Sequence, residues 1–113
     1  MTLTQTEAMA LTLVIEAAVA AAIAPAYART AWLCAAAAVL ASCITHPILW
    51  AIYHDAYQVL GTLTTPALET IIIAAETLAY RAIATTRWDE AALFAAAANF
   101  ASWGAGELIY AWT

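Results

Sequence analysis

The chain has 113 residues, of which 66% are hydrophobic and 10% are charged, and its formal net charge is −5. A soluble domain of this length cannot bury so large an apolar fraction, because small domains leave much of their surface exposed. With three basic residues in total, the chain also lacks the clustered positive charge that a nucleic-acid partner requires. We therefore expect an all-α protein embedded in the lipid bilayer of the cell membrane.

Four apolar stretches predict membrane-spanning helices, because each is close to the roughly 20 residues that a helix needs to cross the hydrocarbon. They cover residues 8–27, 31–53, 67–85 and 91–112. The motif Ala26-Tyr27-Ala28 has the form of a signal-cleavage site, but no basic residue precedes it and Glu16 interrupts the apolar run. We expect the first helix to be retained, which makes residues 1–113 one polytopic four-helix domain.

Local signals mark where three of these helices begin. Thr4 and Glu7 have the spacing of a capping box before the first helix. Thr65-Pro66 fits an N-cap followed by proline at the start of the third. Asp89-Glu90 places negative charge at the start of the fourth, where the helix dipole favours it.

The arginines predict the orientation of the helices. Arg29, Arg81 and Arg87 all fall on one side of the four predicted spans, which the positive-inside rule assigns to the cytoplasm. Both termini and the 54–66 connection then lie outside. Aromatic residues fall near the span ends, as is typical of membrane interfaces: Trp32 and Trp88 at the inner side, and Trp50, Tyr53, Tyr110 and Trp112 at the outer side.

An internal repeat relates the two halves of the chain. A shift of 60 aligns Glu16 with Glu76, "TLT" at 2–4 with "TLT" at 62–64, and "LCAAAAVLAS" at 33–42 with "LFAAAANFAS" at 93–102. The repeats, residues 2–53 and 62–113, are each a helical hairpin. Since two crossings restore the direction of the chain, we expect parallel repeats related by an axis along the membrane normal, with both glutamates at one depth.

A buried polar site is predicted where these glutamates meet the second helix. Glu16, His46 and Glu76 all lie near the middle or in the outer half of their helices. Pro47 has no backbone N–H, so one helical hydrogen bond beside His46 is missing and the carbonyl of the preceding turn is left unpaired. This carbonyl, the Thr45 hydroxyl and the His46 ring form a polar spot. Irregular backbone at membrane depth is tolerated where protein or water covers it. We expect the three ionisable groups to titrate as a coupled set.

Further polar residues fall on helix faces that can support this site. A glutamate near the bilayer centre costs about 3 kcal/mol, so two of them need partners or a role. The expected supporting residues are Ser42, Thr45, Pro47, Glu69, Tyr80, Asn99 and Ser102. If a metal ion binds, Glu16, His46 and Glu76 are the candidate ligands, although the Glu-x-x-His signature of di-iron bundles is absent. A haem or pigment at His46 stays open, because Trp50 lies one turn away, and no cofactor is identified.

Small residues predict how the helices pack. The runs "AAAA" at 35–38 and 95–98, with Gly104 and Gly106, allow close approach of helix backbones within the chain or in a homo-oligomer. Cys34 and Cys43 are about 13 Å apart along one predicted helix, too far for a disulfide. We expect both to be small buried apolar residues.

Four motifs in order resemble a pattern in small prokaryotic four-helix membrane proteins. These are "TLVIEA" at 12–17, "THPILW" at 45–50, "AAETLAYR" at 74–81 and "ANFASWGAG" at 98–106. Such proteins share a first-helix glutamate, Thr-His-Pro, a second glutamate followed by an aromatic residue, and Asn-x-x-Ser-x-x-x-Gly. The resemblance implies a four-helix fold and the location of a site, and it implies no reaction.

Two classes of function follow. The first is proton-coupled or cation transport past Glu16, His46 and Glu76, in a homo-oligomer or with a partner membrane protein. The alternative is an accessory or assembly subunit of a larger membrane complex, with a structural or metal-binding polar core. An intramembrane enzyme is a third possibility, but the sequence shows no activated nucleophile and no complete metal-ligand signature.

Overall fold

A computed structural model describes residues 3–112. Within this range the chain is helical apart from short connections and contains no β-strand, which confirms the all-α prediction. The elements, in order, are α1 (Gln5–Ile23), η1 (Ala24–Tyr27), α2 (Ala31–Leu60), η2 (Gly61–Leu63), α3 (Thr64–Ile83) and α4 (Trp88–Trp112), where η marks a short 3₁₀ helix.

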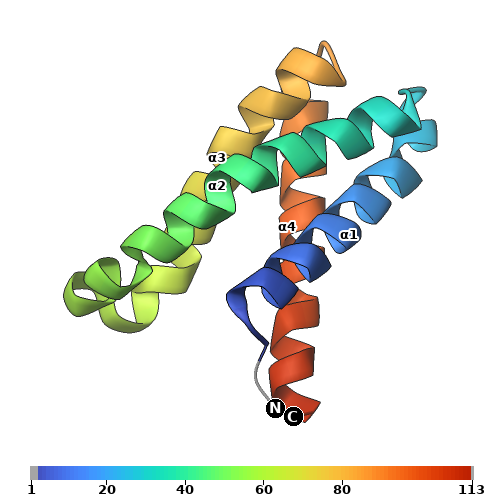
Figure 1. The fold of residues 1–113 in the computed structure, drawn as a ribbon. Coiled ribbons are helices and arrows are strands. Elements are labelled where there is room, and N and C mark those ends of the chain that lie inside the picture. Colours follow the sequence, from blue (N-terminus) through green and yellow to red (C-terminus); the bar gives the residue numbers. More distant parts are fainter. Residues whose placement is uncertain (1–2, 113) are drawn as a thin grey trace.

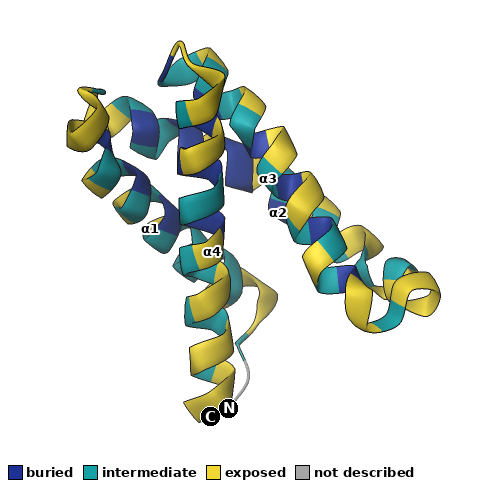
Figure 2. Ribbon diagram, turned by 180° about the vertical axis from the view of Figure 1, so that it is seen from behind, coloured by how far each residue is buried: buried dark blue, intermediate teal, exposed yellow. Residues whose placement is uncertain are grey.

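The helices form an antiparallel bundle in which α1 and α3 each pack against both α2 and α4 (Figure 1). The described parts of the two terminal helices meet at one end, where α1 begins and α4 ends. η1 and the turn between α3 and α4 lie at the opposite end. Towards the terminal end, α2, η2 and α3 diverge from α1 and α4, in both views of the ribbon (Figures 1 and 2). The bundle is therefore closely packed at one end and opened at the other.

The capping box at the start of α1 is confirmed. Thr4 accepts a hydrogen bond from the Glu7 backbone, and the Glu7 carboxylate accepts one from the Thr4 backbone. The predicted end of the second helix at Tyr53 is wrong, because α2 continues to Leu60. Residues 54–60 contain no helix-breaking residue. Gly61, whose positive φ of 58° suits glycine, is the first that ends the helix.

The predicted start of the third helix at Thr65-Pro66 is also wrong. α3 begins directly after η2, with Leu63 rather than Thr65 as the N-cap. The Thr64 hydroxyl donates to the Gly61 carbonyl over 2.7 Å, and the Thr65 hydroxyl instead pairs with the Tyr53 hydroxyl over 2.8 Å. Pro66 fits within the first turn, where its missing N–H has no helical partner to lose. The expected 54–66 connection is thus almost entirely helical.

An apolar core fills the closed end of the bundle. Its side chains are small except for Tyr80 and Phe94, whose rings stack with centroids 5.6 Å apart. Small side chains let the four helices approach closely, as the alanine runs predicted. The buried members are Ala20, Ala24, Cys34, Ala37, Ala38, Tyr80, Ala91, Phe94 and Ala95, and they account for much of the dark blue inner surface in Figure 2.

The prediction for Cys43 is wrong, and the close approach expected at Gly104 and Gly106 is not found within the bundle. A Cβ atom at Gly104 or Gly106 would meet nothing within 4 Å, so neither glycine brings helices together inside this bundle. Both lie on α4 beyond the point where the helices diverge, which explains the missing neighbours. Cys34 is buried as expected, but Cys43 is exposed because it lies on the outer face of α2.

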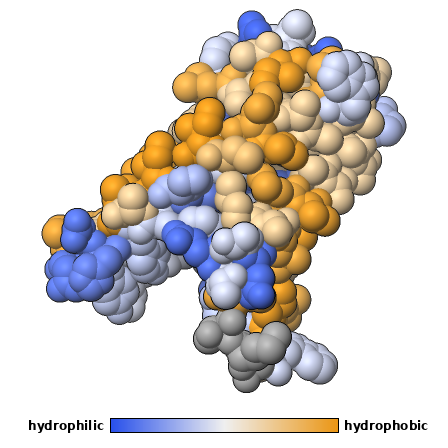
Figure 3. Space-filling model, viewed as in Figure 1, coloured by the Kyte–Doolittle hydropathy of each residue, from blue (hydrophilic) through white to orange (hydrophobic). Residues whose placement is uncertain are grey.

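Two stretches of the described chain are long and apolar enough to cross a membrane by length and composition. They are Gln5–Tyr27, with a mean hydropathy of 2.0, and Ala31–Ile83, with 1.7, which takes in both α2 and α3. Large apolar side chains cover the outer faces of the helices, among them Val14, Leu40, Ile44, Ile48, Ile71, Leu78 and Phe100. Figure 3 shows this apolar colouring over much of the face it presents.

Candidate functional site

Glu16, His46 and Glu76 lie together in the middle of the bundle. Each offers one ligand atom, and these atoms lie within 4.8 Å of one another. The two glutamates are 0% exposed and His46 is 7% exposed. The side chains come from α1, α2 and α3, so the structure brings together the three residues that the repeat and the helix depths had predicted.

Helix α2 joins the two carboxylates through hydroxyl groups. The Ser42 hydroxyl donates to Glu16 Oε2 and also lies 3.3 Å from Glu76 Oε1. The Thr45 hydroxyl donates to Glu76 Oε1 over 3.0 Å. Because a hydroxyl has one hydrogen, Ser42 can donate to one of the two carboxylates at a time.

Helix α4 supplies the remaining donors. The Asn99 amide nitrogen donates to Glu76 Oε2 and to the Ala95 carbonyl, the latter over 2.8 Å. The Ser102 hydroxyl lies 2.9 Å from Glu16 Oε1 and 3.1 Å from the Asn99 carbonyl. All four helices thus contribute to one hydrogen-bonded network around the two carboxylates.

His46 lies beside this network without joining it. Its Nε2 atom is 3.7 Å from Glu16 Oε1, which is longer than a hydrogen bond. Within residues 3–112, neither His46 Nε2 nor the buried Asn99 Oδ1 has a hydrogen-bond partner. The imidazole ring packs against Trp50, with centroids 6.1 Å apart. Since buried polar atoms are nearly always paired, these two atoms indicate that the site accommodates a further species.

Positive charge is remote from the two carboxylates. The guanidinium groups lie at the closed end, where Arg29 pairs with Glu90 over 2.7 Å and Arg87 pairs with Asp89 over 2.7 Å. Arg81 lies over the Trp88 ring at 5.3 Å. Two buried negative charges need compensation. At this site it must come from His46, from bound protons or from another cation.

A groove of about 210 Å³ reaches the site from the open end of the bundle. Its lining includes His46 and Ser102, which belong to the site or contact it, and the carboxylates of Glu69 and Glu107. Towards η1 and the turn between α3 and α4 the site is closed, because the apolar core packs directly beyond Glu16 and Glu76 on that side. The site is thus accessible from the end of the bundle where α1 begins and α4 ends.

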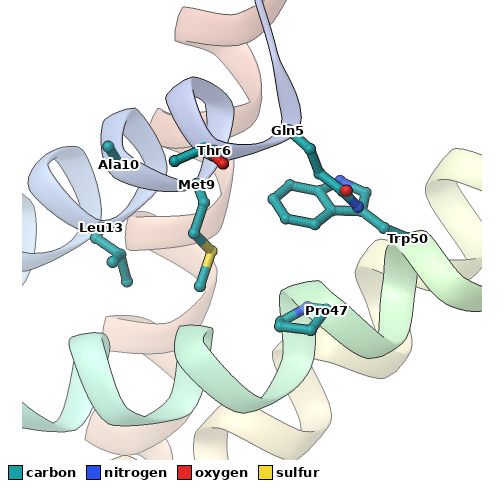
Figure 4. A pocket seen from close by; sticks show the side chains of 7 residues that line it. All are labelled: Gln5, Thr6, Met9, Ala10, Leu13, Pro47 and Trp50. Atoms are coloured by element: carbon teal, nitrogen blue, oxygen red, sulfur yellow. The ribbon is translucent and has the colours of Figure 1, made fainter.

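Trp50 separates this groove from a second one between α1 and α2. The second groove, of about 480 Å³, is lined by Gln5, Thr6, Met9, Ala10, Leu13, Pro47 and Trp50. In Figure 4 the Trp50 indole reaches from α2 towards Gln5 and forms one side of this groove. Figure 3 shows hydrophilic side chains in the notch between the diverging helices, where the grooves open.

The other predicted supporting residues divide into three groups. Ser42, Thr45, Asn99 and Ser102 belong to the network, whereas Glu69 and Pro47 line the grooves. Tyr80 lies in the apolar core, and its buried hydroxyl has no hydrogen-bond partner in the described chain. Glu107 is exposed and also lines the groove.

Comparison with known protein families, curated protein sequences and solved structures finds no match for this chain. Its function must therefore be inferred from the geometry and chemistry of the site.

Proposed function

We propose that the chain is a multi-pass membrane protein with four spanning helices, including α4. Large apolar side chains on the outward faces support this, because they would face water in a soluble protein. The longest dimension of the bundle, 41 Å, exceeds the roughly 30 Å of the hydrocarbon core. Exposed Trp32 and Trp88 at one end, and Tyr110 and Trp112 at the other, fit the two membrane interfaces.

The proposed topology places both termini outside the cytoplasm and treats the halves as parallel repeats. Matched burial supports the repeat: Glu16 and Glu76, Ala20 and Tyr80, Cys34 and Phe94, and Ala38 and Ala98 are buried pairs 60 residues apart. The four motifs of the small prokaryotic family also converge, since they supply Glu16, His46, Glu76, Asn99 and Ser102 to one network. Gly104 and Gly106, which have open space beside them, leave a face of α4 for a second copy or partner.

The function that we propose is cation transport, either of protons or coupled to protons, through the site formed by Glu16, His46 and Glu76. The observation that carries it is a pair of buried carboxylates grouped with His46, which itself lines a groove together with Ser102. Intramembrane carboxylates of this kind mark ion pathways and proton relays. Transport would require the apolar core to open, and the unpaired Tyr80 hydroxyl is the next polar group in that direction.

An accessory or assembly subunit is the second candidate. It is favoured by the way in which Glu16 and Glu76 accept hydrogen bonds from both α2 and α4. Such a network would tie the bundle together without moving any ion.

Proton flux in proteoliposomes tests the transport proposal. A membrane potential is imposed on vesicles that contain a pH-sensitive dye, and the rate of internal pH change is compared with that of empty vesicles. We expect flux with the parent protein and its loss in the variant with both Glu16→Gln and Glu76→Gln. Asp55→Asn, at an exposed carboxylate outside the site, is the matched control and should retain the parent's rate.

Flux that persists in the double variant would contradict transport through this site. No flux from a well-folded parent, together with a lower melting temperature of the double variant, would favour the accessory subunit with a structural core.

A further inference from the structure

We propose that Glu16, His46 and Glu76 bind one divalent transition-metal ion of the zinc or cobalt type. The inference rests on the proposed function in that it names the cation of the proposed transport site. Binding of the ion itself does not depend on transport, so the two proposals can be tested separately.

The spacing of the donor atoms suits a single ion. Zn²⁺ binds imidazole nitrogen and carboxylate oxygen at about 2.0–2.2 Å in tetrahedral geometry, so two of its ligand atoms are about 3.4 Å apart. The donor atoms of Glu16, His46 and Glu76 already lie within 4.8 Å of one another. Side-chain rotations that move each donor atom by about an ångström or less close the remaining distance.

The unpaired imidazole nitrogen is an independent indication of a ligand. His46 is 93% buried, because its exposed fraction is 7%, and Nε2 lies on the side of Glu16. No side chain in the described chain donates to this atom or accepts from it. A histidine that only tied helices together would be expected to use its ring nitrogens in hydrogen bonds. A neutral imidazole with a free Nε2 lone pair is the common form of a metal ligand.

Charge favours a divalent ion over a single proton. Glu16 and Glu76 together carry two negative charges when ionised, and the arginines are engaged at the closed end of the bundle. One ion of charge +2 neutralises both carboxylates at once, which removes the cost of burying them in a medium of low dielectric constant. A protonated His46 would compensate one of the two.

Hydrogen bonds to the carboxylates hold them in place as ligands. Thr45 and Asn99 fix the two oxygens of Glu76, and Ser102 contacts Glu16. Metal-binding carboxylates are commonly oriented by such contacts, whose loss weakens binding by about 10- to 100-fold. One imidazole with two carboxylates, and no thiolate in the group, suits borderline divalent ions better than Cu⁺, Mg²⁺ or Ca²⁺.

The groove supplies the route to the ion site. It is lined by His46 and Ser102 together with the carboxylates of Glu69 and Glu107. Acidic side chains in a cleft raise the local concentration of cations. A hydrated cation can therefore approach from the open end and exchange water for the three ligands.

Metal titration of the purified full chain in mild detergent tests the inference. The protein is first treated with a chelator, and Co²⁺ is then added while the visible d–d absorption is recorded. Zn²⁺ stoichiometry is measured separately by elemental analysis. We expect one ion per chain, a higher melting temperature with Zn²⁺, and no competition from excess Mg²⁺.

Variants locate the ion. Glu16→Gln, His46→Gln and Glu76→Gln should each weaken Co²⁺ binding by at least about 100-fold, and Thr45→Val by about tenfold. His54→Gln, which alters the exposed histidine outside the site, should bind like the parent. If a ligand variant does not fold, the spectrum and stoichiometry of the parent still decide whether an ion binds.

Two results would overturn the inference: no Co²⁺ spectrum with the folded parent, or equal binding by the parent and His46→Gln. If the parent binds no Co²⁺ but vesicles that contain the chelator-treated protein still show proton flux, the metal site is overturned and the proposal of proton transport is retained. Metal binding at the three residues without any flux would support the metal site and contradict transport.

Discussion

Glu16 on α1 and Glu76 on α3 both lie within hydrogen-bonding distance of one hydroxyl group, that of Ser42 on α2. The two glutamates occupy equivalent positions in the proposed repeats, so this contact is also the point where the halves of the chain meet. Because the single hydroxyl hydrogen serves one carboxylate at a time, the pair needs a further proton or cation. The relationship therefore links the repeat in the sequence to the chemistry of the site.

Neutralising Glu76 should be tolerated, whereas removing its side chain should not. In Glu76→Gln the new amide nitrogen can take the place of Oε1, where the Thr45 hydroxyl can accept from it, while the amide oxygen keeps the hydrogen bond from Asn99. We expect a change in unfolding free energy within about 1 kcal/mol. Glu76→Ala leaves a cavity and orphaned donors, and should cost about 2–4 kcal/mol. Thermal melting in detergent measures both, and equal losses would contradict this account of the network.

Enlarging a buried alanine tests which faces form the bundle. Ala37 is fully buried on α2, and Leu40 lies one turn away on the exposed face. We expect Ala37→Leu to destabilise the protein by about 1–3 kcal/mol through overpacking. Leu40→Ala should change stability by about 0.5 kcal/mol or less. Melting curves in the same detergent provide the measurement, and a reversed order would contradict the burial of Ala37 against the neighbouring helices.

The site was predictable because it depends on two regular quantities. The proposed 60-residue repeat placed Glu16 and Glu76 at equivalent positions, and the rise per residue of an α-helix placed His46 near their depth. Sequence could not show that Tyr80, one turn from Glu76 on the same face, leaves the polar network. At the level of Tyr80 the neighbouring helices present Cys34 and Phe94, so its ring packs in an apolar environment.

Helix boundaries were less predictable than helix faces. Residues 54–60 are polar enough to suggest a loop at a membrane surface, yet they continue α2 until Gly61 interrupts it. Side-chain hydrogen bonds such as that between Tyr53 and Thr65 hold the extended hairpin together. Such contacts join residues across a turn and leave no periodic signal in the sequence.

Stability at the closed end should depend on pH through Glu90. Its carboxylate accepts from Arg29 over 2.7 Å and from Thr85 over 2.6 Å, and these hydrogen bonds, that of Arg29 foremost, hold the pKa of Glu90 below its usual range. The unfolded chain has a glutamate pKa of about 4.3. The interaction therefore stabilises the fold fully above that pH, and its contribution is lost as the pH falls through the lower folded-state pKa.

We expect Glu90→Gln to lower the melting temperature near neutral pH and to flatten its decline below about pH 5. Arg29→Gln should have the same effect, because Glu90 then loses its main partner. Melting temperature measured against pH for the parent, both variants and their combination gives the comparison. If the melting temperature of both single variants falls with decreasing pH as steeply as that of the parent, the Arg29–Glu90 contact does not contribute to acid sensitivity.

The topology can be tested by labelling single cysteines in a background with Cys34→Ala and Cys43→Ala. Because the three arginines lie at the closed end, Gln5→Cys and Asp55→Cys, at the other end of the bundle, should react with a membrane-impermeant thiol reagent on intact cells. Thr86→Cys, in the turn between α3 and α4, should react only after the cells are opened. The opposite pattern would reverse the orientation, and labelling of all three would argue against four spans.

Trp50 should control access to His46 from the second groove. Its indole lines both grooves, and the imidazole of His46 packs against it at a centroid distance of 6.1 Å. Replacing the indole by a methyl group in Trp50→Ala joins the two spaces and lets water reach His46 from a second direction. In the same background without native cysteines, His46→Cys should therefore react several-fold faster with a water-soluble thiol reagent when Trp50→Ala is also present.

Ile48→Ala, on an exposed part of α2 outside both grooves, is the matched control and should leave the rate unchanged. Equal rates with and without the Trp50 substitution would show that the indole is not the barrier between the grooves.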